Sequence, residues 1–175
     1  MVKHEKGCGI GPEYPRSHLI ELSFIIAFIS SWLFDLFVFK LNMSFGFLIV
    51  DIVRFFGFAV SLSFSLVLIK LSGRVLSSET IDEMRLLKEG IYAYTRNPMY
   101  LGIFLIYTAF TFLTMSLPCL ICLIFIAIMF NKMVNYEENA LKKICDESYL
   151  RYLETIPKWI PNLARLLSRK PYFQD

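Results

Sequence analysis

The chain has 175 residues, of which 56% are hydrophobic and 17 are phenylalanine. A water-soluble domain of this size has too much surface to hide that many apolar side chains, so the composition indicates a membrane protein. The formal net charge of +3 is too small to indicate nucleic-acid binding, and no cluster of Lys and Arg alternates with aromatic residues.

The first half of the chain predicts two transmembrane helices. Residues 1–18 are polar and form a lead that we expect on the cytoplasmic side. Residues 19–71 then contain two apolar runs, 19–39 and 45–71, each close to the length of about 20 residues that spans a bilayer.

One pair of opposite charges lies inside the second apolar run. Asp51 and Arg54 are three residues apart and therefore share one face of a helix. Charges at membrane depth need a partner or an interface, so we expect an intrahelical ion pair near the outer end of this helix, with a contact to a substrate as the alternative.

A polar linker and a helical hairpin follow. Residues 72–98 form a linker predicted to be cytoplasmic, in which Thr80–Glu89 has the pattern of a short amphipathic helix that Gly90 would end. The next 38 residues, Met99–Tyr136, are apolar and are interrupted only at Pro118. Two spans joined by a tight turn at Leu117–Pro118 account for this length.

The sequence therefore predicts an all-α integral membrane protein with four transmembrane helices, or five if the second apolar run bends into two. The last two helices form a C-terminal hairpin, and an amphipathic cytoplasmic segment follows them. Because no strand precedes a Gly-rich loop anywhere, we expect no Rossmann domain. In this layout only Lys40 lies on the side opposite the other Lys and Arg residues, so both termini are predicted to be cytoplasmic.

The four cysteines indicate neither a metal site nor a disulfide framework. Cys119 and Cys122 form a C-x-x-C motif, but both lie inside the apolar hairpin. Thiols in a membrane helix more often serve as small packing groups, and we expect that role here.

Polar residues gather where the hairpin begins. In Arg96-Asn97-Pro98, Asn97 is suited to cap a helix, and Pro98 is suited to its first position. The helix start offers free N–H groups beside Arg96, with Tyr100 and Gly102 in or near the first turn, which is an arrangement that binds anions. An ordinary cap with an interfacial anchor explains the same residues equally well.

A second polar group lies where the hairpin returns. Asn131, Asn135, Glu138 and Lys142 share one helix face, and Lys132 and Tyr136 lie on the neighbouring face. A solvated helix exit is one interpretation. The other is a cavity for a zwitterionic ligand, with carboxylates for its ammonium group and Arg96 for its carboxylate.

Together these segments resemble a known family. Residues 90–102, Gly-Ile-Tyr-Ala-Tyr-Thr-Arg-Asn-Pro-Met-Tyr-Leu-Gly, resemble the G-x-Y-x-x-x-R-H-P-x-Y-x-G signature of the isoprenylcysteine carboxyl methyltransferases. The related phospholipid N-methyltransferases share much of this signature. A second signature is matched by Lys132, Glu137-Glu138, Tyr149, Tyr152 and the segment 157–161, so the resemblance covers about residues 84–161.

The resemblance implies an integral membrane methyltransferase that uses S-adenosylmethionine (SAM) and has its core in residues 99–161, followed by a cytoplasmic tail at 162–175. It implies that Lys132 and Glu137 lie nearest the reacting groups, with Lys132 steering the acceptor. The cofactor site implied by the motif positions consists of Tyr94, Arg96, Asn97, Pro98, Tyr100, Leu101, Gly102 and Glu138. The predicted localisation is the cell membrane in a prokaryote or the endoplasmic reticulum in a eukaryote.

The acceptor implied is lipophilic and enters from the bilayer. Carboxyl O-methylation of an isoprenylcysteine-like substrate is the leading prediction, while a phospholipid amine, an isoprenoid acid or a lipophilic thiol also suits the motifs. For an amine or a thiol, Glu137 is the candidate base.

Two other functions compete with this one. A membrane sterol or fatty-chain reductase that binds NADPH carries a similar Arg-His-Pro pattern. A non-catalytic scaffold of the same fold would explain why Asn97 and Met84 stand where the family has histidines, Lys132 where it has arginine, and Cys145-Asp146 where it has Phe-Gly.

Overall fold

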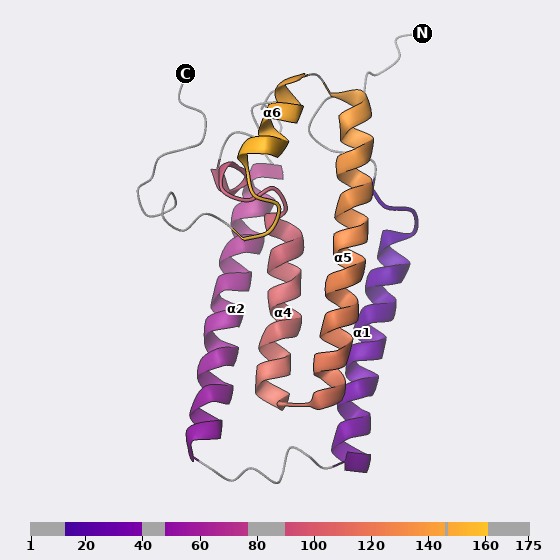
Figure 1. Cartoon of the computed structure of the whole chain (residues 1–175). Coiled ribbons are helices and arrows are strands. Elements are labelled where there is room, and N and C mark those ends of the chain that lie inside the picture. The colour runs from indigo at the N-terminus through magenta and orange to yellow at the C-terminus, as the bar shows by residue number, and fades with distance from the viewer. Residues whose placement is uncertain (1–12, 40–47, 77–89, 146, 161–175) are drawn as a thin grey trace. The chain divides into compact units, whose positions relative to one another are not determined.

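A computed structural model describes residues 13–39, 48–76, 90–145 and 147–160. The described segments are dominated by helices and contain no strand, in the order shown in Figure 1. The predicted all-α class is therefore confirmed.

The first two apolar runs form helices with slightly different limits from those predicted. Helix α1 (Ser17–Phe34) continues into η1 (Asp35–Phe39), a single turn of π-helix. Helix α2 (Leu48–Leu76) extends five residues beyond the predicted end at Leu71. The link between these helices lies outside the described residues.

The hairpin is present, but its turn is placed differently. Helix α4 (Pro98–Thr114) and helix α5 (Leu117–Ile144) are joined at Met115–Ser116, not at Leu117–Pro118. Met115 takes a positive φ of 48°, and the Ser116 hydroxyl accepts a hydrogen bond from the Cys119 N–H at 3.5 Å. The prediction placed the turn at Pro118 because proline ends helices, yet proline is tolerated in a first helical turn.

The polar segments on either side of the hairpin form short helices. The 3₁₀-helix η3 (Gly90–Ala93) precedes α4, and Gly90 has a positive φ of 62°. Helix α6 (Glu147–Thr155) follows α5, which runs well past Tyr136. The predicted amphipathic helix at 80–89 and Met84 lie outside the described residues.

Within the described residues, three segments are long and apolar enough to cross a membrane: Ser17–Phe37, Asp51–Val75 and Leu117–Ile144. Helix α4 is a fourth apolar helix of 17 residues, at the lower end of the range of about 17–25 residues for a spanning helix. The predicted sidedness of the termini stays a prediction.

The cysteines differ from the prediction in one respect. Cys119 and Cys122 are free thiols, and the Ser31 hydroxyl lies 3.0 Å from the Cys122 sulfur. Cys145, in contrast, is disulfide-bonded to a partner outside the described residues.

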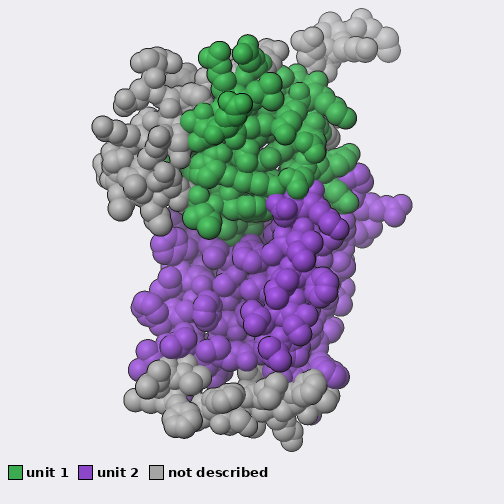
Figure 2. Space-filling view, in the orientation of Figure 1, with its two compact units in different colours: residues 1–14, 68–101, 134–175 green, residues 15–67, 102–133 purple. Residues whose placement is uncertain are grey.

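The chain divides into two compact units, which are coloured separately in Figure 2. Unit 1 consists of Met1–Tyr14, Leu68–Leu101 and Val134–Asp175. Unit 2 consists of Pro15–Val67 and Gly102–Met133. Each long helix after α1 therefore contributes one part to each unit.

Unit 2 is built by aromatic contacts and close backbone approaches between helices. Phe28 of α1 packs edge to face on Tyr107 of α4, and Phe58 of α2 packs in the same way on Phe110. A Cβ atom placed on Gly57 of α2 would lie 2.7 Å from the ring of Phe112 on α4. Small residues permit such close approach between helices in membranes, where apolar surface alone drives little association.

Unit 1 has a small aromatic core. Leu141 of α5, Tyr149 and Tyr152 of α6, and Ile156 are all buried together. The rings of the two tyrosines stack with centroids 6.0 Å apart. This core attaches α6 to the end of α5 and so fixes the segment that follows it.

Candidate active site

The start of α4 orients the first group of site residues. The Asn97 carbonyl accepts a hydrogen bond from the Leu101 N–H at 3.1 Å, which makes Asn97 the residue that precedes the helix. Pro98 is buried at the first helical position, as predicted. The Asn97 side chain, however, turns away from the helix and toward α5.

A set of hydrogen bonds ties the segment before α4 to the chain after α6. The Arg96 N–H donates to the Pro157 carbonyl at 3.0 Å, and the Thr95 hydroxyl donates to the Trp159 carbonyl at 2.9 Å. The Tyr152 hydroxyl donates to the Tyr92 carbonyl at 3.0 Å. Residues 92–97 and 152–159 therefore form one polar structure, although about 60 residues separate them in sequence.

Glu138 is the centre of this structure. It is buried, and its Oε1 lies 3.5 Å from Arg96 Nε and accepts a hydrogen bond from Asn97 Nδ2 at 3.3 Å. The Arg96 guanidinium also donates from Nη1 to the Leu153 carbonyl at 3.1 Å. A carboxylate and a guanidinium so deeply buried must be held together, because each would be costly alone.

Arg96 Nε is a buried donor with no hydrogen-bond partner among the described residues. Its 3.5 Å distance to Glu138 gives an ion pair but not a hydrogen bond. Buried donors are almost always satisfied in folded proteins, so an exception marks a place where a ligand acceptor is expected.

Glu137 is held by a different partner. The Tyr100 hydroxyl donates to Glu137 Oε1 at 2.6 Å, a short bond typical of a charged acceptor. Tyr100 lies in the first turn of α4, and Glu137 is next to Glu138 on α5. The two neighbouring carboxylates therefore have different partners: Glu138 pairs with Arg96, and Glu137 accepts from Tyr100.

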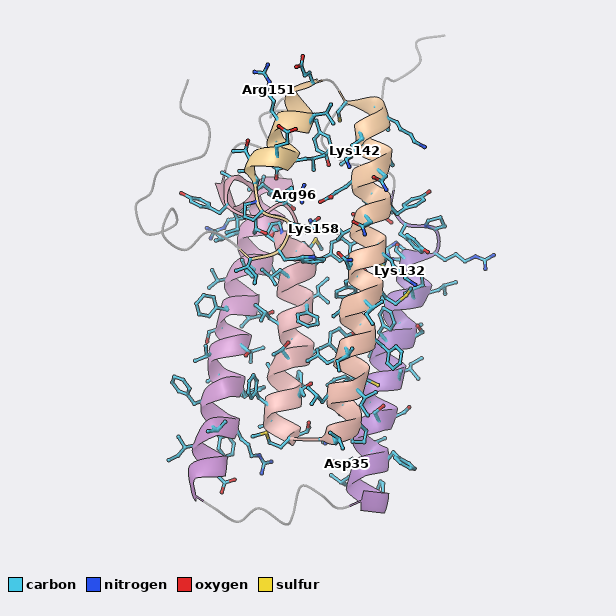
Figure 3. The ribbon with its side chains drawn as sticks, in the orientation of Figure 1. Asp35, Arg96, Lys132, Lys142, Arg151 and Lys158 are labelled. Atoms are coloured by element: carbon cyan, nitrogen blue, oxygen red, sulfur yellow. The ribbon has the colours of Figure 1, made fainter. Side chains whose placement is uncertain are left out.

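Lys158 adds a second cation to the candidate site, as Figure 3 shows beside Arg96. Its ammonium donates to Asn135 Oδ1 at 2.7 Å and lies 5.6 Å from the centre of the Trp159 ring. Partial burial lowers the pKa of Lys158, and the Arg96 charge lowers it further, while Glu138 opposes the shift. The Lys158 carbonyl also accepts from Asn97 Nδ2 at 3.2 Å.

The two core tyrosines stay protonated. Burial is the main reason that the pKa values of Tyr149 and Tyr152 are raised, and the nearby Glu138 adds to both shifts. A neutral Tyr152 hydroxyl is what the hydrogen bond to the Tyr92 carbonyl requires.

The structure brings together five of the predicted site residues. These are Arg96, Asn97, Tyr100, Glu137 and Glu138, all of unit 1. Pro98 is buried behind them, and Tyr94 and Leu101 are half-buried nearby in sequence.

Two predicted residues belong to unit 2. Gly102 is buried, and its carbonyl accepts a hydrogen bond from Ser65 at 2.7 Å. Lys132, predicted to steer the acceptor, is exposed on α5. On one helix it lies about 140° around the axis from Glu137, because five residues separate them.

Thr95 and Lys158 were not among the predicted site residues, whereas Asn135 lies on the helix face that was interpreted as one side of a ligand cavity. The Thr95 hydroxyl and the carbonyl and ammonium of Lys158 bind partners that are distant in sequence, which no local residue pattern reveals. The signal available for Lys158 was its position in the segment 157–161, which carries part of the family resemblance. Among the described residues no group of three or more His, Cys, Asp or Glu side chains forms a metal site.

The described residues define a class of protein, namely an all-helical protein with helices apolar enough to span a membrane and a buried polar site built from the ends of its hairpin. A family model described as phospholipid methyltransferase matches residues 52–148, more than half of the chain. The chain therefore belongs to the phospholipid methyltransferase family. Comparison with curated proteins found no match, and comparison with solved structures found none either.

The family match confirms the predicted relationship to membrane methyltransferases. It includes Arg96, Tyr100 and both carboxylates, and it ends before α6 is complete. It does not specify the isoprenylcysteine branch of the resemblance.

Proposed function

We propose that this chain transfers the methyl group of SAM to a polar acceptor carried by a lipophilic molecule. The observation that carries the proposal is the Arg96–Glu138 pair, in which Arg96 Nε is buried and lacks a hydrogen-bond acceptor. SAM supplies, when bound, an electrophilic methyl group on a sulfonium centre.

The residues present fit the amino-acid end of this cofactor. A carboxylate ligand would give Arg96 Nε the acceptor it lacks, and Glu138 is placed to pair with an ammonium group. Asn97 Nδ2, now shared between Glu138 and the Lys158 carbonyl, orients the Glu138 carboxylate. The methyl transfer itself needs alignment and exclusion of water more than proton transfer.

Of the acceptors considered, a lipid amine agrees best with the groups around Glu137. A carboxylate held by Tyr100 attracts an ammonium group and repels an acceptor that is itself a carboxylate. Glu137 would take the proton that the ammonium must lose before its nitrogen has a lone pair to attack with. The product is then the N-methylated lipid, with S-adenosylhomocysteine as the leaving molecule.

An isoprenylcysteine-like carboxylate is the second candidate. It needs no base, but it needs a cation to hold it beside Glu137, which is the role predicted for Lys132. If Lys132→Ala keeps full turnover on a prenylated cysteine, Lys132 has no such role. If Lys132→Ala loses turnover on the prenylated cysteine but not on a lipid amine, the result supports a carboxylate as the acceptor.

Calorimetric titration of the detergent-purified protein with S-adenosylhomocysteine tests the cofactor. We expect saturable binding that Glu138→Ala abolishes and that Glu147→Ala, at a carboxylate 82% exposed on α6, leaves unchanged. NADPH is titrated in parallel. Binding of NADPH alone would support the reductase, and binding of neither ligand by folded protein would support the scaffold.

A further inference from the structure

Unit 2 contains a cavity of about 660 Å³ that no part of the proposed reaction uses. It lies between α1 and α4 and is lined almost wholly by apolar side chains, with Arg54 of α2 at one end. We call it the α1–α4 groove. Its volume is in the range of about 300–1,000 Å³ that is usual for sites of small organic ligands.

The groove is open along the side formed by α1. Ile25, Ile29 and Trp32 line it and are 46%, 47% and 39% exposed, respectively. Because this part of α1 belongs to a segment apolar enough to span a membrane, these side chains face hydrocarbon and not water. A hydrocarbon chain can therefore enter the groove sideways.

The length of the groove matches one leaflet of a bilayer. On α4 it extends from Ile103 to Thr114, which corresponds to about 16 Å at a rise of about 1.5 Å per residue. Half of a hydrocarbon core of about 30 Å is about 15 Å. One acyl chain of a lipid in one leaflet would fill it from end to end.

The charged end of the groove lies close to the turn of the hairpin. Arg54 contacts the carbonyl of Leu113, one residue before α4 ends at Thr114, and the end of a spanning helix is the level where lipid headgroups are found. Arg54 Nε and Nη2 donate to the Leu113 carbonyl at 3.1 and 2.8 Å, and Nη1 lies 3.5 Å from Asp51. The predicted Asp51–Arg54 pair is thus confirmed, but it is too long for a strong hydrogen bond.

Arg54 therefore has N–H groups left for a further acceptor. A guanidinium has five N–H donors, of which two are committed to Leu113. Phosphate oxygens match the remaining donors in geometry and charge. Asp51, 48% exposed and one helical turn away, presents a negative charge beside that phosphate position.

We propose that the α1–α4 groove binds a zwitterionic phospholipid. One acyl chain lies along α4, the phosphate contacts Arg54, and the headgroup ammonium contacts Asp51. The residues of this site all belong to unit 2, whereas Arg96, Tyr100, Glu137 and Glu138 of the proposed methyl-transfer site belong to unit 1. The inference does not depend on the proposed function.

The test is native mass spectrometry of delipidated protein titrated with phosphatidylcholine, phosphatidylglycerol and diacylglycerol that carry the same acyl chains. We expect saturable 1:1 binding of phosphatidylcholine, with phosphatidylglycerol weaker and diacylglycerol about tenfold weaker because it has no phosphate. Equal binding of all three lipids would overturn the proposal.

Substitutions locate the site. Ile29→Trp fills the groove and should reduce phosphatidylcholine binding by about tenfold. Ile26→Trp adds the same bulk to an isoleucine of α1 that is 57% exposed and is not one of the lining residues, and it should leave binding unchanged. Equal effects of the two tryptophans would contradict the proposal.

Two charge variants separate the headgroup contacts. Arg54→Gln should lower the affinity for both phospholipids to that for diacylglycerol, and Asp51→Asn should lower it for phosphatidylcholine alone. The midpoint of thermal unfolding, followed by circular dichroism, is measured in parallel and should be unchanged in the Ile29 variant, which shows that the protein is folded. A dimer that Ile29→Trp dissociates would instead identify the groove as a contact between two copies and overturn the lipid assignment.

Discussion

Arg96 Nε and Glu138 Oε1 lie 3.5 Å apart, and their side chains are only 14% and 12% exposed. The two residues come from opposite ends of the helical hairpin. Their mutual position is therefore produced by the fold and not by local sequence. Each side chain is the partner of the other in a largely dry place, where either charge alone would be costly.

Removal of one charge of this pair should be strongly destabilising. Glu138→Gln leaves the Arg96 guanidinium buried without a counter-charge, and we expect a loss of roughly 2–4 kcal/mol. The free energy of unfolding is measured by denaturant titration in detergent micelles. The double variant Arg96→Met, Glu138→Gln should lose less than the sum of the two single variants, and strict additivity would show that the residues do not interact.

Tyr100→Phe tests the orientation of Glu137. The variant removes one short hydrogen bond to a carboxylate, so kcat should fall by about tenfold to a hundredfold. The affinity for S-adenosylhomocysteine should change by less than about threefold, because Arg96 and Glu138 are unaffected. Loss of cofactor binding with unchanged kcat would assign Tyr100 to the cofactor instead of the acceptor.

Thr95→Val tests the connection between the start of α4 and the chain after α6. It removes the hydrogen bond to the Trp159 carbonyl, and we expect a loss of about 1 kcal/mol. Hydrogen exchange should increase in residues 153–160. Thr155→Val is the matched control, because the Thr155 hydroxyl bonds only within its own helix, to Arg151.

If hydrogen exchange in residues 153–160 increases equally in Thr95→Val and Thr155→Val, the increase reports a general loss of stability and not the loss of one hydrogen bond. A specific increase in the Thr95 variant would show that this hydroxyl holds the closing segment in place.

Alkaline pH should weaken unit 1 through Tyr152. Burial raises its pKa above the ordinary value of 10.0, so the folded state keeps a proton that the unfolded state loses. Above about pH 10 the unfolded state binds fewer protons, and stability falls as the pH rises. Tyr152→Phe should make the fall in melting temperature between pH 9 and about 11 less steep.

Tyr149 has a shift in the same direction, so some pH dependence should persist in the Tyr152 variant. Tyr136→Phe is the matched control, because that side chain is 43% exposed and lies outside the core. An unchanged slope in Tyr152→Phe would show that other groups cause the alkaline loss.

Gly57→Ala should destabilise unit 2. The new methyl group would lie 2.7 Å from the Phe112 ring, and relief of this overlap must move a helix or an aromatic side chain, which costs about 1–3 kcal/mol. Gly73→Ala on the same helix meets no atom within 4 Å and should be neutral or stabilising by up to about 1 kcal/mol. Thermal unfolding monitored by circular dichroism compares the two, and equal midpoints would refute the close contact.

The helical class and the residues at the hairpin ends could be predicted because their causes are local. Apolar runs of bilayer length must form helices, since the backbone has no other partner in hydrocarbon. Asn97-Pro98 indicates a helix start for equally local reasons. The turn lies at Met115–Ser116, and the prediction placed it two residues too far along the chain. The reason is that a proline can either follow a helix or begin one.

The sequence by itself determined that this protein is an all-α membrane chain, and its motif order indicated the methyltransferase family. Only the tertiary structure decided that Arg96 pairs with Glu138 and Tyr100 with Glu137, and that Thr95 and Asn97 bind backbone carbonyls of residues 158 and 159. The physical reason is that periodicity and helix caps act over a few residues. A buried ion pair or a bond to a distant carbonyl depends on where helices cross, and every residue of the chain has a carbonyl to offer.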